Sequence, residues 1–78
     1  MEYNAAKEIM NTKLSTFCFQ DYDGRNKAAG LIHNNCGGSD AYEEHSWDGE
    51  YYIDIYSYCT DVPLAVQYCQ ANGGKRVD

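Results

Sequence analysis

The feature that most constrains the fold of this chain is the presence of four cysteines among 78 residues, at Cys18, Cys36, Cys59 and Cys69. A domain of this size buries only about 60–65% of the surface that its unfolded chain exposes, so its apolar core alone provides little stability. Small secreted domains make up this deficit with disulfides. The sequence therefore predicts two disulfides and an oxidising, extracellular environment.

Metal binding is the alternative use of these cysteines, because His33 and His45 could join them as ligands. Structural zinc sites take ligands at short spacings such as C-x2-C, and the sequence contains no such pair. An EF-hand calcium loop is also excluded, since the glycine and the bidentate glutamate that should follow Asp21 and Asp23 are missing. We expect no metal and no cofactor.

The charge of the chain excludes one class of partner. Its formal net charge is −6, with only six Lys and Arg residues, whereas nucleic-acid binding depends on neutralising phosphates with basic side chains. No apolar run approaches the roughly 18 residues that a membrane span requires. The first thirty residues also lack the apolar block of a signal peptide. We expect the mature form of a secreted protein, with Met1 an added start codon.

Hydrophobic periodicity and turn residues predict an α+β fold with two parts, a helical extension over residues 1–13 and a domain over 14–78. The expected elements are a short helix over residues 4–12, a strand over 14–21, a helix over 26–36, strands over 41–47 and 50–59, a helix between Asp61 and Asn72, and an edge strand or frayed end over 75–78. The predicted fold is a small antiparallel sheet with two helices on one face.

The hairpin is predicted from Asp48-Gly49, a strong signal for a two-residue turn. A loop of that length would place Glu43 opposite Asp54, and like charges in directly opposed positions are destabilising. We therefore leave the register of the hairpin open, since a slip of one residue would move every side chain of one strand to the other face.

The predicted topology also ranks the three possible disulfide connectivities. With the first strand running upward, Cys36 and Cys59 both fall at the bottom of the domain. Cys18 and Cys69 both lie roughly 10–13 Å higher, given the rises per residue of strand and helix. The heights therefore favour the pairs Cys18–Cys69 and Cys36–Cys59.

Three cysteine-containing segments resemble those of a known family. They are the run from Cys18 through Asp21 and Asp23 to Gly24, the run from Leu31 to Cys36 with Gly37, and Val66-Gln67-Tyr68-Cys69. Over residues 16–72 the layout is similar to that of the killer protein six-like toxins of smut-fungus viruses and of small secreted effectors of plant-pathogenic fungi. The chain departs from the toxins in having fewer cysteines and none after Cys69.

This resemblance implies an α/β sandwich with a ferredoxin-like βαββα core and an extracellular life, with later entry into host tissue as one route of action. It also implies toxin or virulence activity without known catalysis. We accordingly expect a virulence effector that binds a host protein. A killer toxin acting on fungal cell membranes and a small secreted hydrolase such as a ribonuclease are the alternatives.

Candidate binding residues follow from placing Cys18 and Cys59 towards the helices. The opposite, outer face of the sheet would then be aromatic and would carry Phe17, Phe19, Tyr52, Tyr56 and Tyr58, with Trp47 beside the hairpin turn. Tyrosine-rich surfaces are typical of binding sites, because each ring offers a large contact area and a polar group. Cover by the N-terminal helix, self-association through this face and a packing role for Trp47 are the alternatives.

Acidic and histidine side chains are candidates for partner binding or for catalysis. The acidic residues gather around the hairpin, at Glu43, Glu44, Asp48, Glu50 and Asp54. These carboxylates could attract a basic partner or could only keep the surface solvated. A ribonuclease would require an acid–base pair and a cation, drawn from His33, His45, Glu43, Glu44 and Arg25. No nucleophile motif or ligand spacing supports such a site, so we expect a binding protein and no enzyme.

Overall fold

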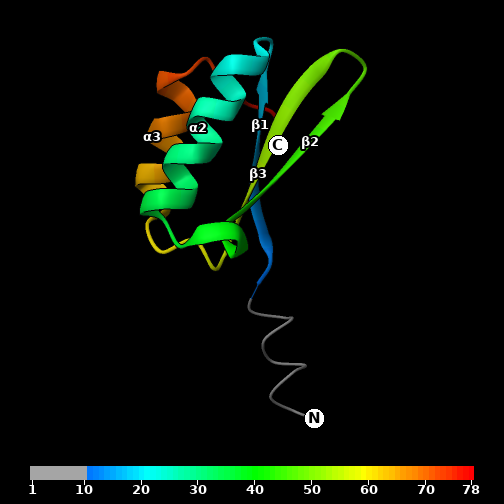
Figure 1. Cartoon of the computed structure of the whole chain (residues 1–78). Helices are drawn as coiled ribbons and strands as arrows, with labels where there is room; N and C mark the ends of the chain where they lie inside the picture. Colours follow the sequence, from blue (N-terminus) through cyan, green and yellow to red (C-terminus); the bar gives the residue numbers. More distant parts are fainter. Residues whose placement is uncertain (1–10) are drawn as a thin grey trace.

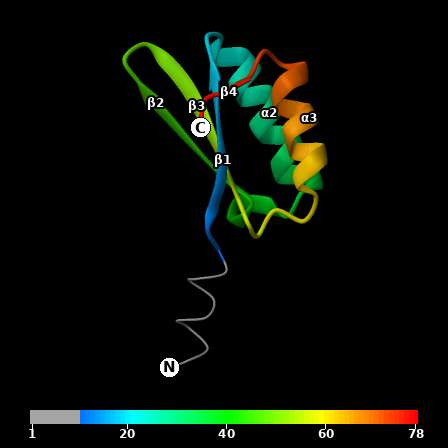
Figure 2. The same ribbon diagram turned by 180° about the vertical axis from the view of Figure 1, so that it is seen from behind.

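The computed structural model describes residues 11–78, so the helix expected over 4–12 lies almost wholly outside the described residues. The elements are β1 (Lys13–Phe19), α2 (Tyr22–Asn35), the 3-10 turn η1 (Gly38–Asp40), β2 (Tyr42–Trp47), β3 (Glu50–Tyr56), α3 (Val62–Ala71) and β4 (Lys75–Arg76). The four strands form one antiparallel sheet in the order β2-β3-β1-β4. Figures 1 and 2 show α2 and α3 side by side on one face of this sheet, which confirms the predicted architecture.

The first long helix begins earlier than the sequence indicated. The segment from Asp21 to Gly24, predicted as a turn, contains the helix N-terminus, because the Asp21 carboxylate accepts a hydrogen bond of 3.1 Å from the Gly24 N–H. An N-cap aspartate satisfies one of the free N–H groups of the first turn and so stabilises the helix start. The helix ends before Gly37, whose φ of 116° suits glycine.

The hairpin forms around Asp48-Gly49 as predicted, with both residues at positive φ, 54° and 78°. This two-residue turn sets the register, and Glu43 lies directly opposite Asp54. The register that the sequence left open is therefore the one with opposed carboxylates.

The second helix has the predicted limits. Asp61 caps it by accepting a hydrogen bond of 3.2 Å from the Leu64 N–H, and Pro63 occupies the first turn, where a missing N–H does no harm. After the helix, Gly73 at φ 89° turns the chain back to the sheet. The C-terminal residues pair with β1 as the edge strand β4, one of the two outcomes expected for this segment.

The direction of the side chains of β1 differs from the prediction. Phe17 and Phe19 are fully buried between the sheet and the helices, facing the same way as Ile53 and Ile55, and so cannot belong to an exposed aromatic face. Full burial of a Phe side chain is worth about 1.5–3 kcal/mol, more than the smaller thiol of Cys18 can offer. The two phenyl rings therefore take the core side of the strand.

This reversal changes one of the expected disulfides. Cys18 alternates with Phe17 and Phe19 and lies on the side of the sheet away from the helices, whereas Cys69 is fully buried in the core. The pair Cys18–Cys69 is therefore wrong, because the sheet separates the two residues. Cys36 and Cys59 do meet, 4.3 Å apart, although no cysteine pair is at disulfide distance.

Candidate functional site

The face of the sheet that is turned away from α2 and α3 is the candidate site, and we call it the outer face. It carries Thr16, Cys18, Glu43, His45, Trp47, Glu50, Tyr52, Asp54 and Tyr56 from the strands β1, β2 and β3. Because alternate residues of a strand share a face, these side chains project together from three neighbouring strands. The outer face thus combines tyrosines, carboxylates and one histidine on a rigid platform.

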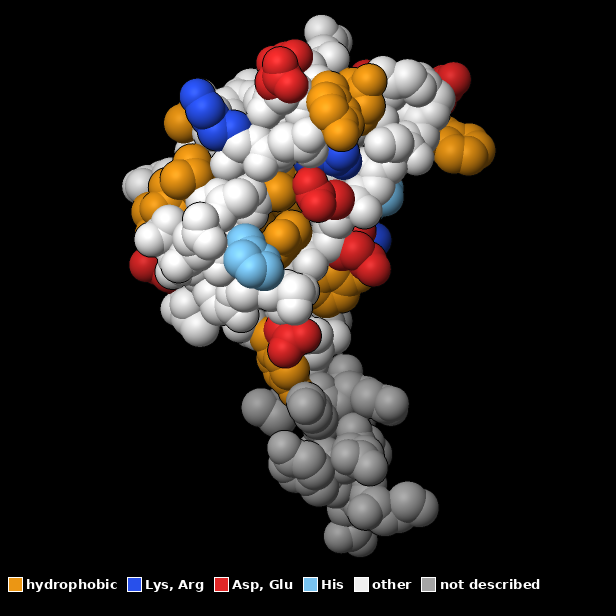
Figure 3. Space-filling model, viewed as in Figure 1, with side chains coloured by type: hydrophobic (Ala, Val, Ile, Leu, Met, Phe, Trp, Pro, Cys, Tyr) orange, Lys and Arg blue, Asp and Glu red, His pale blue; other side chains and the backbone are white. Residues whose placement is uncertain are grey.

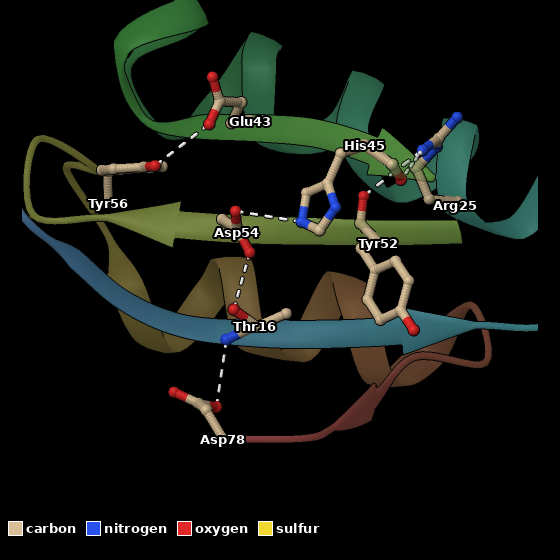
Figure 4. A network of polar contacts seen from close by, with 8 residues as sticks. All are labelled: Thr16, Arg25, Glu43, His45, Tyr52, Asp54, Tyr56 and Asp78. Carbon is tan, nitrogen blue, oxygen red and sulfur yellow. Dashed lines mark hydrogen bonds and ion pairs between the residues drawn. The ribbon is translucent and has the colours of Figure 1, made fainter. Parts of the chain in front are cut away.

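Asp54 is the centre of a polar network on this face, shown in Figure 4. Its side chain is buried, and both carboxylate oxygens have partners. Oδ1 accepts a hydrogen bond of 2.7 Å from the hydroxyl of Thr16, and Oδ2 lies 3.2 Å from Nε2 of His45. The His45 ring is stacked on the Tyr52 ring with a centroid distance of 4.9 Å. Asp54 and Tyr52 together hold the imidazole in one orientation.

The two tyrosines of the outer face donate to carboxylates. The Tyr56 hydroxyl donates to Glu43 at 3.1 Å, and the Tyr52 hydroxyl donates to Glu50 at 3.2 Å. Desolvation together with nearby Cys18 and Glu50 raises the pKa of Tyr52 to about 12, and desolvation with the Glu43 hydrogen bond also raises the pKa of Tyr56. Both phenols therefore stay protonated at neutral pH and act as hydrogen-bond donors.

A groove of about 600 Å³ lies at one end of the outer face. Among the residues that line it are Cys18, Glu50, Tyr52, Asn72, Lys75 and Val77. Desolvation and the neighbouring Glu50 raise the pKa of the Cys18 thiol, so this cysteine is a weak nucleophile at neutral pH. The groove offers a mixed apolar and polar surface next to the tyrosines.

The C-terminal residues hold the far side of the outer face in place. Asp78 accepts a hydrogen bond of 3.1 Å from the Thr16 N–H and another of 3.2 Å from Nε of Arg76. The Thr16 bond and the Arg76 charge lower the pKa of Asp78. Thr16 is thus bound to carboxylates through both its main chain and its side chain.

The predicted binding residues do not all lie where they were expected. Tyr52 and Tyr56 lie on the outer face as expected, while Phe17 and Phe19 lie in the core. Tyr58 follows the end of β3 and so is not on the strand face where it was placed. Trp47, the last residue of β2, is 74% exposed and does not pack in the core.

The residues considered for a ribonuclease site are not brought together. Glu44 points to the helix side of the sheet, where its carboxylate lies 3.3 Å from Nε of Arg25. His33 on α2 shares a hydrogen bond of 3.2 Å with the Tyr42 hydroxyl. Of that set, Glu43 and His45 share the outer face, whereas the cation Arg25 is paired with Glu44 on the helix side, so the groups considered for a ribonuclease lie on opposite faces of the sheet.

Arg25 has a structural role that the sequence analysis missed. Its guanidinium is buried and donates hydrogen bonds to the main-chain oxygens of His45, at 3.0 Å, and Tyr52, at 3.4 Å. It also lies over the rings of Tyr22 and Tyr51, 5.6 and 5.5 Å from their centroids. Arg25 thereby fastens α2 to the hairpin that carries most of the outer face. No sequence pattern indicates the hydrogen bonds to His45 and Tyr52, because their acceptors are main-chain oxygens.

Three of the cysteines lie close together at the helix side of the sheet. Cys36 ends α2, Cys59 precedes α3, and Cys69 lies on α3. Burial and the proximity of Cys59 raise the pKa of Cys36 to about 11, and burial with the two other thiols raises that of Cys69 to about 12. As thiols, these groups are therefore protonated and slow to react.

No protein-family model, curated protein or solved structure matches the chain. Within residues 11–78, no helix has the length and apolar character needed to cross a membrane.

Proposed function

We propose that this protein is a secreted effector of a plant-pathogenic fungus that binds a host protein without catalysis, and that its outer face makes the contact. The observation that carries the proposal is the grouping of Tyr52, Tyr56 and His45 on one face of a rigid sheet. Tyrosine side chains are enriched at protein interfaces, because they combine a large contact area with a hydroxyl group and lose little conformational entropy.

The topology supports the family expectation behind this proposal. Strand order β2-β3-β1-β4 with two helices on one face is the arrangement of ferredoxin-like βαββαβ folds. The resemblance to killer protein six-like toxins and fungal effectors implies such a core. Since one fold supports many functions, the outer face and not the topology must identify the partner.

An extracellular location would be supported by one disulfide, and we propose that Cys36 and Cys59 form it. They are the cysteines that approach to 4.3 Å, one at the end of α2 and one just before α3. Closing this loop would contribute about 3–4 kcal/mol. Peptide mapping of the oxidised, unreduced protein should recover one crosslinked pair of peptides that contain Cys36 and Cys59. Four free thiols in the secreted protein would contradict the proposal.

The binding proposal is tested by affinity capture from host plant extract. The wild-type protein should retain a host protein, and the variants Tyr52→Ala and Tyr56→Ala should each weaken its binding about tenfold or more, as is typical for aromatic residues at interfaces. Tyr68→Ala is the matched control, because Tyr68 is a half-buried tyrosine of α3, on the other side of the sheet. Equal binding by all four proteins would show that the outer face is not the contact surface.

One observation favours a second candidate, a small hydrolase. His45 is oriented by the buried carboxylate of Asp54, an arrangement that general bases use. Turnover of RNA or of a glycan that is lost in His45→Ala would support this alternative, with His33→Ala as a control, since His33 is an exposed histidine of α2. Inhibition of fungal growth by the purified protein would instead support the killer-toxin alternative.

A further inference from the structure

We propose that the free edge of β2 binds an extended, positively charged segment of the partner protein, which adds to the sheet as a further strand. The main-chain groups of Glu44 and Ser46 would form the new hydrogen bonds. This inference rests on the proposed function, since it names the chemistry of the bound segment and the way it is held. It uses the border of the sheet, next to the outer face.

The edge of β2 is available for pairing. β2 is the outermost strand of the sheet, and in the described part of the chain no strand pairs with its outer side. In a hairpin closed by Trp47 and Glu50, alternate residues of β2 direct their N–H and C=O groups to β3. The main-chain groups of the residues in between, Glu44 and Ser46, therefore point away from the sheet.

The two edges of the sheet differ in length. β4 has only two residues, whereas β2 has six. In β2, every residue from Glu43 to Trp47 is exposed. Long exposed edges are templates for the addition of another strand. Of the two edges, β2 is thus the one that can form several consecutive main-chain hydrogen bonds with a peptide.

The negative charge near the edge of β2 favours a positively charged partner segment. Glu43 lies on β2, and Asp48 and Glu50 lie at or beside the turn, whereas the carboxylate of Glu44 is paired with Arg25. Figure 3 shows acidic side chains spread over this view of the molecule and few basic ones. Two copies of β2 would bring like charges together, which opposes self-pairing in a chain of net charge −6. A segment rich in Lys or Arg meets complementary charge instead.

Trp47 provides an anchor at the end of this edge. Its exposed fraction of 74% exceeds the 53% of Tyr22 and the 54% of Val77, two other exposed large apolar side chains. Tryptophan is enriched among the residues that contribute most to binding energy. Because Trp47 ends β2, its ring lies where it can cover one end of an added strand.

The test is a titration of the isotope-labelled protein with a short synthetic peptide of alternating lysine and valine, followed by NMR and amide hydrogen exchange. Binding should slow exchange of the Glu44 and Ser46 amides, which face solvent in the free protein. A peptide of alternating glutamate and valine should not bind, and added salt should weaken binding of the lysine peptide because the attraction is electrostatic.

Two variants separate main-chain pairing from charge. Ser46→Pro removes an outward N–H without touching the pairing to β3, and should weaken peptide binding about tenfold or more. Glu43→Gln removes one charge but keeps an acceptor for the Tyr56 hydroxyl, and should weaken binding severalfold. Asp23→Asn is the matched control, since this exposed carboxylate lies in the first turn of α2; it should bind the peptide as the wild type does.

The outcomes distinguish this inference from the proposed function. No binding of the lysine peptide, or unchanged binding by Ser46→Pro, would overturn the β2 site. Dimerisation of the wild type that is abolished by Ser46→Pro would also overturn it, because a second copy of the chain would then occupy the edge of β2. Loss of host-protein capture in Tyr52→Ala with full capture by Ser46→Pro would reject the edge and retain the outer face. Absence of any captured host protein, with the peptide still protecting β2, would reject only the effector function.

Discussion

Glu43 on β2 and Asp54 on β3 are directly opposed carboxylates, and each has its own hydrogen-bond donors. Glu43 accepts from the Tyr56 hydroxyl, while Asp54 accepts from Thr16 and lies against His45. These separate donors compensate the repulsion that a pair of like charges would otherwise cause. The outer face therefore depends on a shared polar network, and removal of one donor should destabilise the fold.

Thr16→Val replaces the hydroxyl that donates to buried Asp54 with a methyl group of similar size. A buried carboxylate that loses a donor costs about 1–3 kcal/mol, so we expect a loss of that order in the free energy of unfolding. Urea denaturation measures it. Thr60→Val is the control, because Thr60 is exposed and lies outside this network. Equal stability of the two variants would contradict the importance of the Thr16 bond.

Arg25→Lys should loosen the hairpin from α2. Lysine keeps the charge, but it cannot reproduce the planar guanidinium that donates to His45 and Tyr52 and stacks between two rings. We expect a loss of about 1–3 kcal/mol in unfolding free energy. Lys27→Ala changes an exposed residue of the same helix and should stay within about 0.5 kcal/mol of the wild type. Calorimetry or urea denaturation measures both unfolding free energies. Similar losses in Arg25→Lys and Lys27→Ala would mean that Arg25 is only a surface cation.

Two glycine-to-alanine substitutions should change stability in opposite directions. A Cβ at Gly74 would lie 2.7 Å from both the main-chain oxygen of Cys69 and a ring carbon of Phe19, so Gly74→Ala should destabilise by about 1–3 kcal/mol. A Cβ at Gly30 meets nothing within 4 Å, and alanine is the better helix former, so Gly30→Ala should stabilise by about 0.5–1 kcal/mol. Thermal melts of the two variants should shift to opposite sides of the wild type. An unchanged or raised melting temperature of Gly74→Ala would contradict the close contact of Gly74 with Phe19, and a lowered one of Gly30→Ala would contradict the open space at Gly30.

The reduced protein should become less stable at alkaline pH. Folding raises the pKa of Cys36 to about 11 and that of Cys69 to about 12, from 9.0. Above pH 9 the unfolded chain therefore loses these protons before the folded one does, and stability falls as the pH rises towards 11–12. Urea denaturation at pH 7, 9 and 10.5 tests this trend.

The Cys69→Ala variant is the control for this titration. Loss of the buried side chain lowers the stability of this variant at neutral pH. Its unfolding free energy should nevertheless decline less steeply between pH 9 and 10.5, because only one of the two thiols with a raised pKa remains. A wild-type stability that is constant from pH 8 to 10.5 would contradict the burial of these thiols.

Several elements could be predicted from the sequence because their signals are local. Asp48-Gly49 specifies a two-residue hairpin, and Asp61 with Pro63 specifies the start of α3. Alternation in β3 placed Ile53 and Ile55 correctly in the core. Where two local interpretations competed, as for a turn or a helix start at Asp21, sequence reasoning chose the wrong one.

The candidate site was predicted only in part. Tyr52 and Tyr56 follow from the alternation of β3, and these two residues remain on the outer face. The other half of the predicted aromatic face depended on Cys18 pointing inward to form a disulfide. That assumption was wrong, and it misplaced Phe17 and Phe19 as well. The clamp formed by Arg25 was missed, since it joins a side chain to main-chain oxygens far away in the sequence.

The sequence by itself determined the kind and order of β1, α2, β2, β3 and α3, because caps, turn residues and periodicity act over a few neighbouring positions. Only the tertiary structure decided which face of β1 is buried and which cysteines meet. Both faces of β1 carry apolar groups, so the choice depends on what α2 and α3 can cover. Burial of two phenyl rings contributes more free energy than burial of one thiol. This difference arises only when the helices lie on the sheet, because they cover one face of β1 and leave the other uncovered.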